Sequence, residues 1–429
     1  MKKIILKNCT VVTMKNNKLE ILENRDILIR DDIIYDIGIG LVDKEAEKYN
    51  MKGKVVIPGF INCHTHVPMS IFRETLEGLT LQDWLNKKIW PAESHLTKED
   101  VYNGALHSFI EMIKSGTTTC NDMYVKTDAV CHAAKKCKFR LFTGHHLMDI
   151  DGNGDKHIEE ERKLVEKIKE TDKLHHTITL HGFYTSTPEY LEKVVKLKED
   201  LKLPVHLHFC ENKKEVEDIK RIYNVKSPVE LLDRYFKDDR KILAHCVELN
   251  KQEIKDMSKM KDLSVVYNPV SNLKLGCGFA NITEFNKNNI NICLGTDGQG
   301  SGSNLDMFNV MKITALVNKA LEKDPTNLPA EDVFKFATIN GAKALGMENK
   351  LGSIEIGKKA DLVVLDLNDE FVTPINNLIS QIVYNASPNN VYMTIIGGDI
   401  LYIKNKYLVL EDEKEILNKS EEIIKRIMK

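Results

Sequence analysis

The chain has 429 residues, of which 42% are hydrophobic and 29% charged, a composition typical of a globular protein with a sizeable core. Its 61 lysines and arginines nearly balance its 63 aspartates and glutamates, so the net charge is −2. This balance argues against attraction to nucleic acid or to anionic membranes, and we expect neither as a partner. No apolar run reaches the roughly 18 residues that a membrane-spanning helix needs.

The nine cysteines are scattered and form no CxxC pair. The first residues, MKKIILKNCTVVTM, have only short apolar stretches, and they predict a strand rather than a signal peptide. Free thiols without an export signal are typical of the reducing cytoplasm, where we expect this protein.

Short β-type runs occur at both ends of the chain, within residues 1–56 and again within 351–411. Two terminal segments of the same character predict one small β-sandwich domain, built from both ends around a central insert. The last residues, 412–429, have helical spacing and a strongly charged face, so they predict a packing helix.

Between residues 57 and 350, strand-like apolar runs alternate with charged amphipathic segments. The eight runs are VVIPGFINCHTH, TTTCNDMY, RLFTGHH, TITLHGF, PVHLHFCE, KILAHC, SVVYNP and NICLGTD. Repeated βα units with apolar strands predict an α/β fold, and eight units of this size fit a (β/α)8 TIM-like barrel. An open, doubly wound sheet is the alternative. Polar residues of chemical interest lie at the C-terminal ends of the runs, which favours the barrel, because that edge carries the active site in barrel enzymes.

Several histidines and carboxylates at these strand ends suggest a metal site. His64 and His66 are two residues apart in an extended segment, so both imidazoles face the same side. His208 ends the fifth run and Glu211 follows three residues later, while His245 ends the sixth run and Asp297 the eighth. Three neutral nitrogens and one carboxylate suit a divalent ion such as Zn²⁺ and leave a position for water, although Fe²⁺, Mn²⁺ or Ni²⁺ would also fit. Each residue alone is better explained as a polar group that is hydrogen-bonded at a strand end. Because all of them lie at the same edge of the sheet, a metal site is the better explanation for the group.

Several motifs resemble those of the amidohydrolase superfamily: PGFINCHTHVPM, HCVEL, NPVSNLKLG, GTDG and SIEIGKKADLVVLD. Within it, HTHVPMSIFRETLEGLTLQDWLNKKIWPAESHLTKED followed by SGTTTCNDMY is similar to the 5′-methylthioadenosine/S-adenosylhomocysteine deaminases, relatives of 5′-deoxyadenosine deaminase. The resemblance spans essentially the whole chain. It implies hydrolytic deamination at C6 of an adenine nucleoside, giving the inosine analogue and ammonia, and it implies a homo-oligomer.

The resemblance also implies a role for individual residues. The metal ligands would be His64, His66, His208 and Asp297. Proton transfer would fall to Glu211 and His245 together with Asp297, and substrate contacts to Glu93 at the ribose, His181 and Glu211 at the purine, and Trp84 near the 5′ substituent. A bound ion can lower the pKa of water from 15.7 to about 7, and Glu211 would then carry a proton to ring N1. The fourth strand ends at His181 and lacks the bridging lysine of binuclear relatives, which predicts a single ion.

Two positions depart from the family pattern. Where relatives that use the homocysteine nucleoside carry arginines, this chain has His145 and His157, which we expect beside the 5′ end of the substrate. Neutral imidazole lacks the permanent charge and bidentate fork of arginine. Methylthioadenosine, 5′-deoxyadenosine or adenosine therefore fits better than S-adenosylhomocysteine.

Other functions remain open from the sequence. Another mononuclear amidohydrolase, such as a guanine or pterin deaminase or a chlorotriazine hydrolase, is the nearest alternative, and an inactive assembly protein on the same fold is a remote one. The segment 149–160 also matches a calcium-loop pattern, but it follows a strand and carries Lys156, so we interpret it as a polar loop.

Overall fold

The computed structural model describes residues 2–410 and 412–428 and has a parallel barrel at its centre. The barrel strands are β6 (Phe60–Thr65), β7 (Thr117–Tyr124), β8 (Arg140–Leu147), β10 (Ile178–Leu180), β11 (Val205–Phe209), β12 (Lys241–His245), β13 (Leu263–Tyr267) and β14 (Asn291–Leu294), with β9 (Leu174–His176) pairing beside β8. Each of the eight strands on the main path overlaps one of the eight predicted runs, and only β8 and β13 extend beyond their runs, by one residue each. The barrel prediction is therefore confirmed and the open sheet is not found.

Backbone contacts close the barrel between its first and last strands. The hydrogen-bonded order runs from β14 through to β6. Across the seam, the Asp297 N–H donates to the His64 carbonyl at 3.1 Å, and the Thr296 N–H donates to Asn62 Oδ1 at 3.1 Å. The seam thus brings two of the predicted metal ligands, one from each end of the barrel sequence, next to each other.

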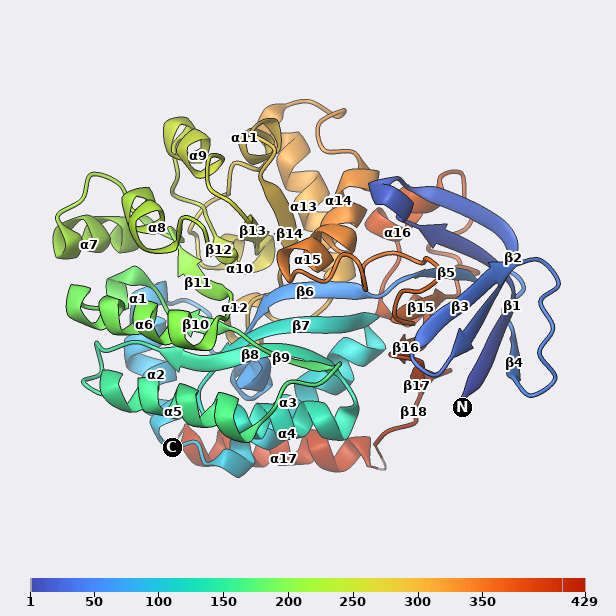
Figure 1. Cartoon of the computed structure of the whole chain (residues 1–429), viewed down its shortest axis with the longest axis horizontal. Coiled ribbons are helices and arrows are strands. Elements are labelled where there is room, and N and C mark those ends of the chain that lie inside the picture. Colours follow the sequence, from blue (N-terminus) through green and yellow to red (C-terminus); the bar gives the residue numbers. More distant parts are fainter. Residues whose placement is uncertain (1, 411, 429) are drawn as a thin grey trace.

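Amphipathic helices connect the strands and cover the outside of the barrel (Figure 1). They are α3 (Lys98–Lys114), α4 (Thr127–Cys137), α5 (Gly154–Lys167), α6 (Pro188–Leu201), α7 (Lys213–Tyr223), α8 (Val229–Phe236), α9 (Lys251–Met257), α11 (Ile282–Lys287), α13 (Met307–Glu322), α14 (Ala330–Phe336) and α15 (Ile339–Ala344). Side-chain caps define several starts, as at α3, where Thr97 and Asp100 form a reciprocal capping box. Apolar residues on the inner faces of these helices join one large core with the strands.

The two chain ends form one β domain beside the barrel. Its strands are β1 (Lys3–Thr13), β2 (Glu20–Arg30), β3 (Ile33–Gly38), β4 (Glu47–Asn50), β5 (Val55–Pro58), β15 (Leu362–Leu365), β16 (Val391–Ile396), β17 (Asp399–Ile403) and β18 (Lys406–Tyr407). β5 and β15 pair antiparallel and join the two halves into one sheet, which Figure 1 shows as blue strands beside orange and red ones. Bulges between several strand pairs bend this sheet around its own core, which includes Ile4, Leu362 and Met393.

The C-terminal helix α17 (Glu413–Ile427) packs along α3 on the outside of the barrel. Ile416, Ile423 and Ile427 are buried on its inner face, and Arg426 pairs with Asp100 at 2.5 Å. None of the helices that the structure describes is long and apolar enough to cross a membrane. All nine cysteines are free thiols, as expected.

Candidate active site

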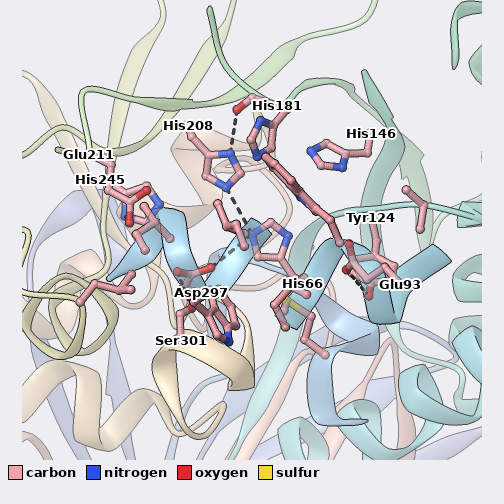
Figure 2. A pocket seen from close by; sticks show the side chains of 18 of the residues that line it. His66, Glu93, Tyr124, His146, His181, His208, Glu211, His245, Asp297 and Ser301 are labelled. Atoms are coloured by element: carbon pink, nitrogen blue, oxygen red, sulfur yellow. Dashed lines mark hydrogen bonds and ion pairs between the residues drawn. The ribbon is translucent and has the colours of Figure 1, made fainter. Parts of the chain in front are cut away.

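The four predicted metal ligands meet at the C-terminal rim of the barrel. Figure 2 shows three of them, His66, His208 and Asp297. His66 Nε2 lies 3.2 Å from His208 Nε2 and 3.3 Å from Asp297 Oδ1, and His64 Nε2 lies 3.6 Å from the same carboxylate oxygen. A tetrahedral ion with bonds of 2.0–2.1 Å needs ligand atoms about 3.3–3.4 Å apart. The spacing of these donor atoms therefore fits a single metal ion.

Backbone carbonyls orient two of the histidines. The Nδ1 atom of His66 lies 2.7 Å from the carbonyl of Met123, and Nδ1 of His208 lies 2.7 Å from the carbonyl of His181. A carbonyl can only accept, so each Nδ1 carries the proton, and each Nε2 keeps its lone pair for a metal ion.

His64 lies deepest and depends on a second histidine. It is fully buried, and its Nδ1 lies 2.8 Å from Nε2 of His206 on β11. The opposite ring atom, His64 Nε2, has no hydrogen-bond partner among the described residues. A buried polar atom without a partner is costly, so this nitrogen is well placed to bind an ion.

Asp297 follows β14 in a left-handed backbone conformation with φ of 61°. Its Oδ2 accepts hydrogen bonds from Ser271 at 2.6 Å and from Ser301 at 2.8 Å, which leaves Oδ1 toward the histidines. Burial opposes the charged form, but contacts with His64 and His66 hold the pKa of Asp297 well below its usual range. Asp297 is thus a carboxylate favoured in its ionised form and held in one orientation.

Glu211 and His245 lie beside the metal ligands. Burial raises the pKa of Glu211 well above its usual range, and the carboxylates of Asp297 and Glu215 add to the shift. His245 ends β12, and its Nδ1 lies 2.9 Å from the side-chain amide of Asn272. Burial lowers the pKa of His245 to about 3, against the opposing effect of Asp297. Burial therefore favours the protonated form of Glu211 and the neutral form of His245 next to the metal site.

Glu93 marks the other end of the pocket. It lies on α2 (Trp90–Ser94), and its Oε1 accepts a hydrogen bond of 2.6 Å from the Tyr124 hydroxyl at the end of β7. Figure 2 shows Glu211 and His245 on one side of the pocket, with Glu93 and Tyr124 across from them. A ligand can therefore meet a carboxyl group at each end.

Two histidines lie between these ends. His181 follows β10, and its Nδ1 lies 2.9 Å from the Thr185 hydroxyl. Burial lowers the pKa of His181 to about 3, and the nearby imidazoles of His66 and His64 lower it further. The ring of His146 on β8 lies 4.6 Å from that of His181, and its Nε2 has no partner within the part of the chain that the structure describes.

The helical segment after β6 covers the pocket. It consists of α1 (Leu81–Trp84), the π-helix η3 (Leu85–Ile89) and α2. The Trp84 indole is 3% exposed and donates to Thr75 Oγ1 at 3.1 Å. Gly300 permits this close packing, because a Cβ at that position would lie 2.7 Å from the indole. The pocket beneath contains about 660 Å³ of empty space, part of it open to solvent.

Comparison with known proteins agrees with this geometry. Residues 55–401 match the model of the amidohydrolase family. The chain belongs to this family. It is 39% identical over 430 residues to a 5-methylthioadenosine/S-adenosylhomocysteine deaminase from Thermoanaerobacter pseudethanolicus, with 97% of each chain covered. It is 35% identical over 430 residues to a 5′-deoxyadenosine deaminase from Methanosarcina acetivorans, with 99% of each covered.

A solved structure extends the likeness to three dimensions. An adenosine deaminase from Xanthomonas campestris with bound zinc superposes with a TM-score of 0.93 at 29% identity, covering 99% of this chain and 98% of that one. The family and the His/Asp cluster together show that this amidohydrolase has a site for a divalent metal ion.

The structure moves two predicted substrate residues away from the pocket. His145 and His157 do not line it; His145 borders a separate hollow between β8 and α5, in contact with His157 and Glu160. Successive side chains of a strand point to opposite faces, so His146 faces the pocket of this amidohydrolase while its neighbour faces the helix layer. In this structure His146 lines the pocket and His145 does not.

The segment 149–160 is also not simply a polar loop, because α5 begins at Gly154. Asp149 accepts hydrogen bonds from Thr187, and Asp155 pairs with Lys193 at 2.5 Å. These carboxylates point to different partners, so they do not form the single oxygen cage that calcium needs.

The sequence analysis also missed residues that support the amidohydrolase site. Tyr124, His146, Ser301 and Asn272 each line the pocket or contact a residue that does. Asn272 lies within the motif NPVSNLKLG, and Ser301 lies three residues after the motif GTDG. These motifs were the signal in the sequence that could have indicated both residues. Tyr124 had only its place at the end of a strand.

Proposed function

We propose that this amidohydrolase is a hydrolytic deaminase that replaces the C6 amino group of an adenine nucleoside with oxygen. The main support for this function is a pair of carboxyl groups at opposite ends of the pocket, with Glu211 beside the proposed metal ligands and Glu93 across from it. An adenine nucleoside needs both ends, because its reacting amidine lies at one end and its ribose diol at the other. The relatives named for adenine nucleosides support the same substrate class.

We further propose one ion, Zn²⁺, held by His64, His66, His208 and Asp297, although the donor set also suits Fe²⁺, Mn²⁺ or Ni²⁺. When bound, such an ion lowers the pKa of water from 15.7 to about 7 and so supplies a nucleophile at neutral pH. The zinc-bound adenosine deaminase supports the choice of ion.

The protein's own groups then move the protons. Asp297, itself one of the proposed ligands, and the neutral imidazole of His245 beside it take up the proton of the attacking water. Glu211, protonated in its buried position, delivers its proton to ring N1 as the C6–O bond forms. The proton taken from the water then passes to the amino group as the C6–N bond breaks, and the proton remaining on the C6 hydroxyl returns to Glu211 as the carbonyl forms. Nucleoside and water have then become the inosine analogue and ammonia.

The opposite end of the pocket binds the sugar. Glu93 can accept a hydrogen bond from each hydroxyl of a vicinal diol, and Tyr124 holds the carboxylate in position. His181 and His146 offer imidazole nitrogens to the purine. Trp84 and Leu85 form an apolar wall, and no lysine or arginine is among the described residues that line the pocket. This wall suits a methylthio, deoxy or unmodified 5′ group better than the charged tail of S-adenosylhomocysteine.

A panel of substrates tests the proposal. Zinc-loaded protein is incubated with adenosine, methylthioadenosine, 5′-deoxyadenosine, S-adenosylhomocysteine, guanine and a chlorotriazine, and the loss of adenine absorbance or release of product is followed. We expect turnover of the first three nucleosides and poor use of the fourth. Turnover of guanine or the triazine alone would instead favour the alternative of another amidohydrolase, and no turnover of any compound would favour an inactive assembly protein.

We also propose that the enzyme works in the cytoplasm as a homo-oligomer. The nine free cysteines suit a reducing compartment. Phe371 is 80% exposed and Ile375 45% exposed on the same segment, and such apolar side chains are suited to contact a second copy. Sedimentation of the purified protein measures the oligomeric state, and Phe371→Ser should weaken the assembly if this segment contributes.

A further inference from the structure

A second cluster of possible metal ligands lies outside the pocket, between β8 and α5. His145 Nε2 lies 3.0 Å from His157 Nδ1 and 3.0 Å from Glu160 Oε2, and the three ligand atoms lie within 4.8 Å of one another. We propose that this cluster binds a second divalent ion of the zinc class. The site is independent of the reaction proposed above.

The cluster is built by the fold. His157 and Glu160 are three residues apart on α5, so they lie on the same face of the helix. His145 comes from the outward face of the strand beneath it. The two histidines are only 5% and 8% exposed, so both rings are held in place by their surroundings. Only Glu160, whose side chain is 41% exposed, has freedom to move.

Neutral imidazoles can satisfy the contacts within the cluster only if one proton of His145 is shared between two acceptors. His157 Nε2 lies 2.9 Å from Asp151 Oδ2, so this nitrogen carries a proton and the neutral ring presents a lone pair at Nδ1. His145 Nε2 has one proton at most, yet it faces both this lone pair and the carboxylate of Glu160. If His157 is charged instead, the lone pair of His145 faces the carboxylate. A cation shared by the three atoms removes the conflict.

The contact with Asp151 also matches the surroundings of metal-binding histidines. A histidine that binds a metal through one nitrogen usually donates its other N–H to a carboxylate or a carbonyl. His66 and His208 in the pocket do so with backbone carbonyls. His157 does so with Asp151. The same arrangement therefore occurs twice on this barrel.

The donor set selects the class of ion. Two imidazoles and one carboxylate are the ligands of many zinc sites with an open fourth position, whereas calcium takes oxygen ligands alone. The observed separations of 3.0 Å need to grow by a few tenths of an ångström to match a zinc site, which the exposed Glu160 side chain permits. His145 and Glu160 border the hollow that also contains Lys126, Asp128 and Lys163, so solvent can supply a fourth ligand.

Such an ion would join β8 to α5. It would also hold the segment after β8 through Asp151. Because His146, the next residue of β8, lines the active pocket, the ion would stabilise the part of the barrel that carries a pocket side chain.

Counting bound zinc tests this proposal. Metal-free full-length protein is dialysed against Zn²⁺, and the bound metal is measured by elemental analysis. We expect two equivalents for the wild type, one for Glu160→Gln and for His157→Ala, and two for the control His132→Ala, whose imidazole lines the same hollow but lies outside the cluster. Glu160→Gln keeps the size of the side chain, and circular dichroism of each variant checks its fold.

A second background separates the two sites. His208→Ala should lose the pocket ion and keep one equivalent, and adding Glu160→Gln should remove that one as well. Zn²⁺ should then raise the melting temperature of His208→Ala but not of the double variant. The proposal would be overturned if the wild type bound a single equivalent of zinc, or if Glu160→Gln bound two. Protonation of the histidines would then explain how the hydrogen bonds of the cluster are satisfied.

Discussion

Two groups of buried polar residues lie at opposite rims of the barrel and differ in how fully the protein satisfies them. At the N-terminal rim, the side chain of Arg140 is 0% exposed, and its Nε and Nη2 atoms donate to the two oxygens of Asp361 at 2.8 and 3.0 Å. Asp361 also accepts the Gly397 N–H at 2.7 Å. This bidentate pair joins the barrel to the β domain and is complete without any ligand.

The C-terminal rim is the opposite case. His64 Nε2 and His146 Nε2 lack partners among the described residues, and Glu211 is held protonated by burial. A hydrogen-bond network in which every buried group has a partner stabilises the fold. A buried network with unpaired donors and acceptors can instead bind a ligand. In a TIM barrel this difference follows the fold, since the C-terminal rim carries chemistry and the other rim carries stability.

The largest expected effect comes from breaking the metal site. His208→Ala should lower kcat/KM for adenosine by about 10⁴-fold or more, because the activation of water depends on the ion. Elemental analysis measures the loss of bound metal, and initial rates measure the loss of activity. The exposed His95→Ala serves as the matched control and should retain both metal and rate. Full activity of His208→Ala would show that this rim is not the metal site.

Glu211→Gln should lower kcat by about 10²–10⁴-fold while the protein keeps its pocket ion, because the amide cannot transfer a proton. Rates and bound metal are compared with those of Glu217→Gln, an exposed change on the following helix. Near-normal turnover by Glu211→Gln would remove its assigned role.

At the opposite rim, Arg140→Met should lower the free energy of unfolding by about 3–5 kcal/mol, because Asp361 is left as an uncompensated buried charge. The folded variant should keep its kcat/KM. Urea denaturation measures the loss, and Arg162→Met, which breaks the more exposed pair with Asp200, should cost about 1 kcal/mol or less. Equal losses in the two variants would contradict the contrast between the rims.

Tyr124→Phe should have the smallest effect. Loss of a hydrogen bond to a charged group costs about 1.5–3 kcal/mol, or roughly 10–150-fold in kcat/KM, because Glu93 is then less well positioned. The effect should disappear with 2′,3′-dideoxyadenosine, which lacks the diol. An equal effect on both nucleosides would mean that Tyr124 acts elsewhere.

Much of the fold and of the metal cluster could be predicted because both depend on local patterns. The eight apolar runs matched the barrel strands, and the His-x-His spacing placed two imidazoles on one side of an extended chain. His208 and Asp297 needed only the rule that parallel strands end at the same rim. The resemblance to a known family then added Glu93 and His181, which no local pattern indicated.

By itself the sequence determined the order of the strands, the rim that carries the chemistry and the types of ligand available there. Only the tertiary structure decided which of His145 and His146 faces the pocket. Neighbouring side chains of a strand point to opposite faces, but the sequence does not say which of the two points inward. The tertiary structure also decided that Tyr124 meets Glu93 and that Arg140 meets Asp361, since these partners are 31 and 221 residues apart in the chain. Contacts of that kind follow from how helices and sheets pack, and no periodicity in the sequence records them.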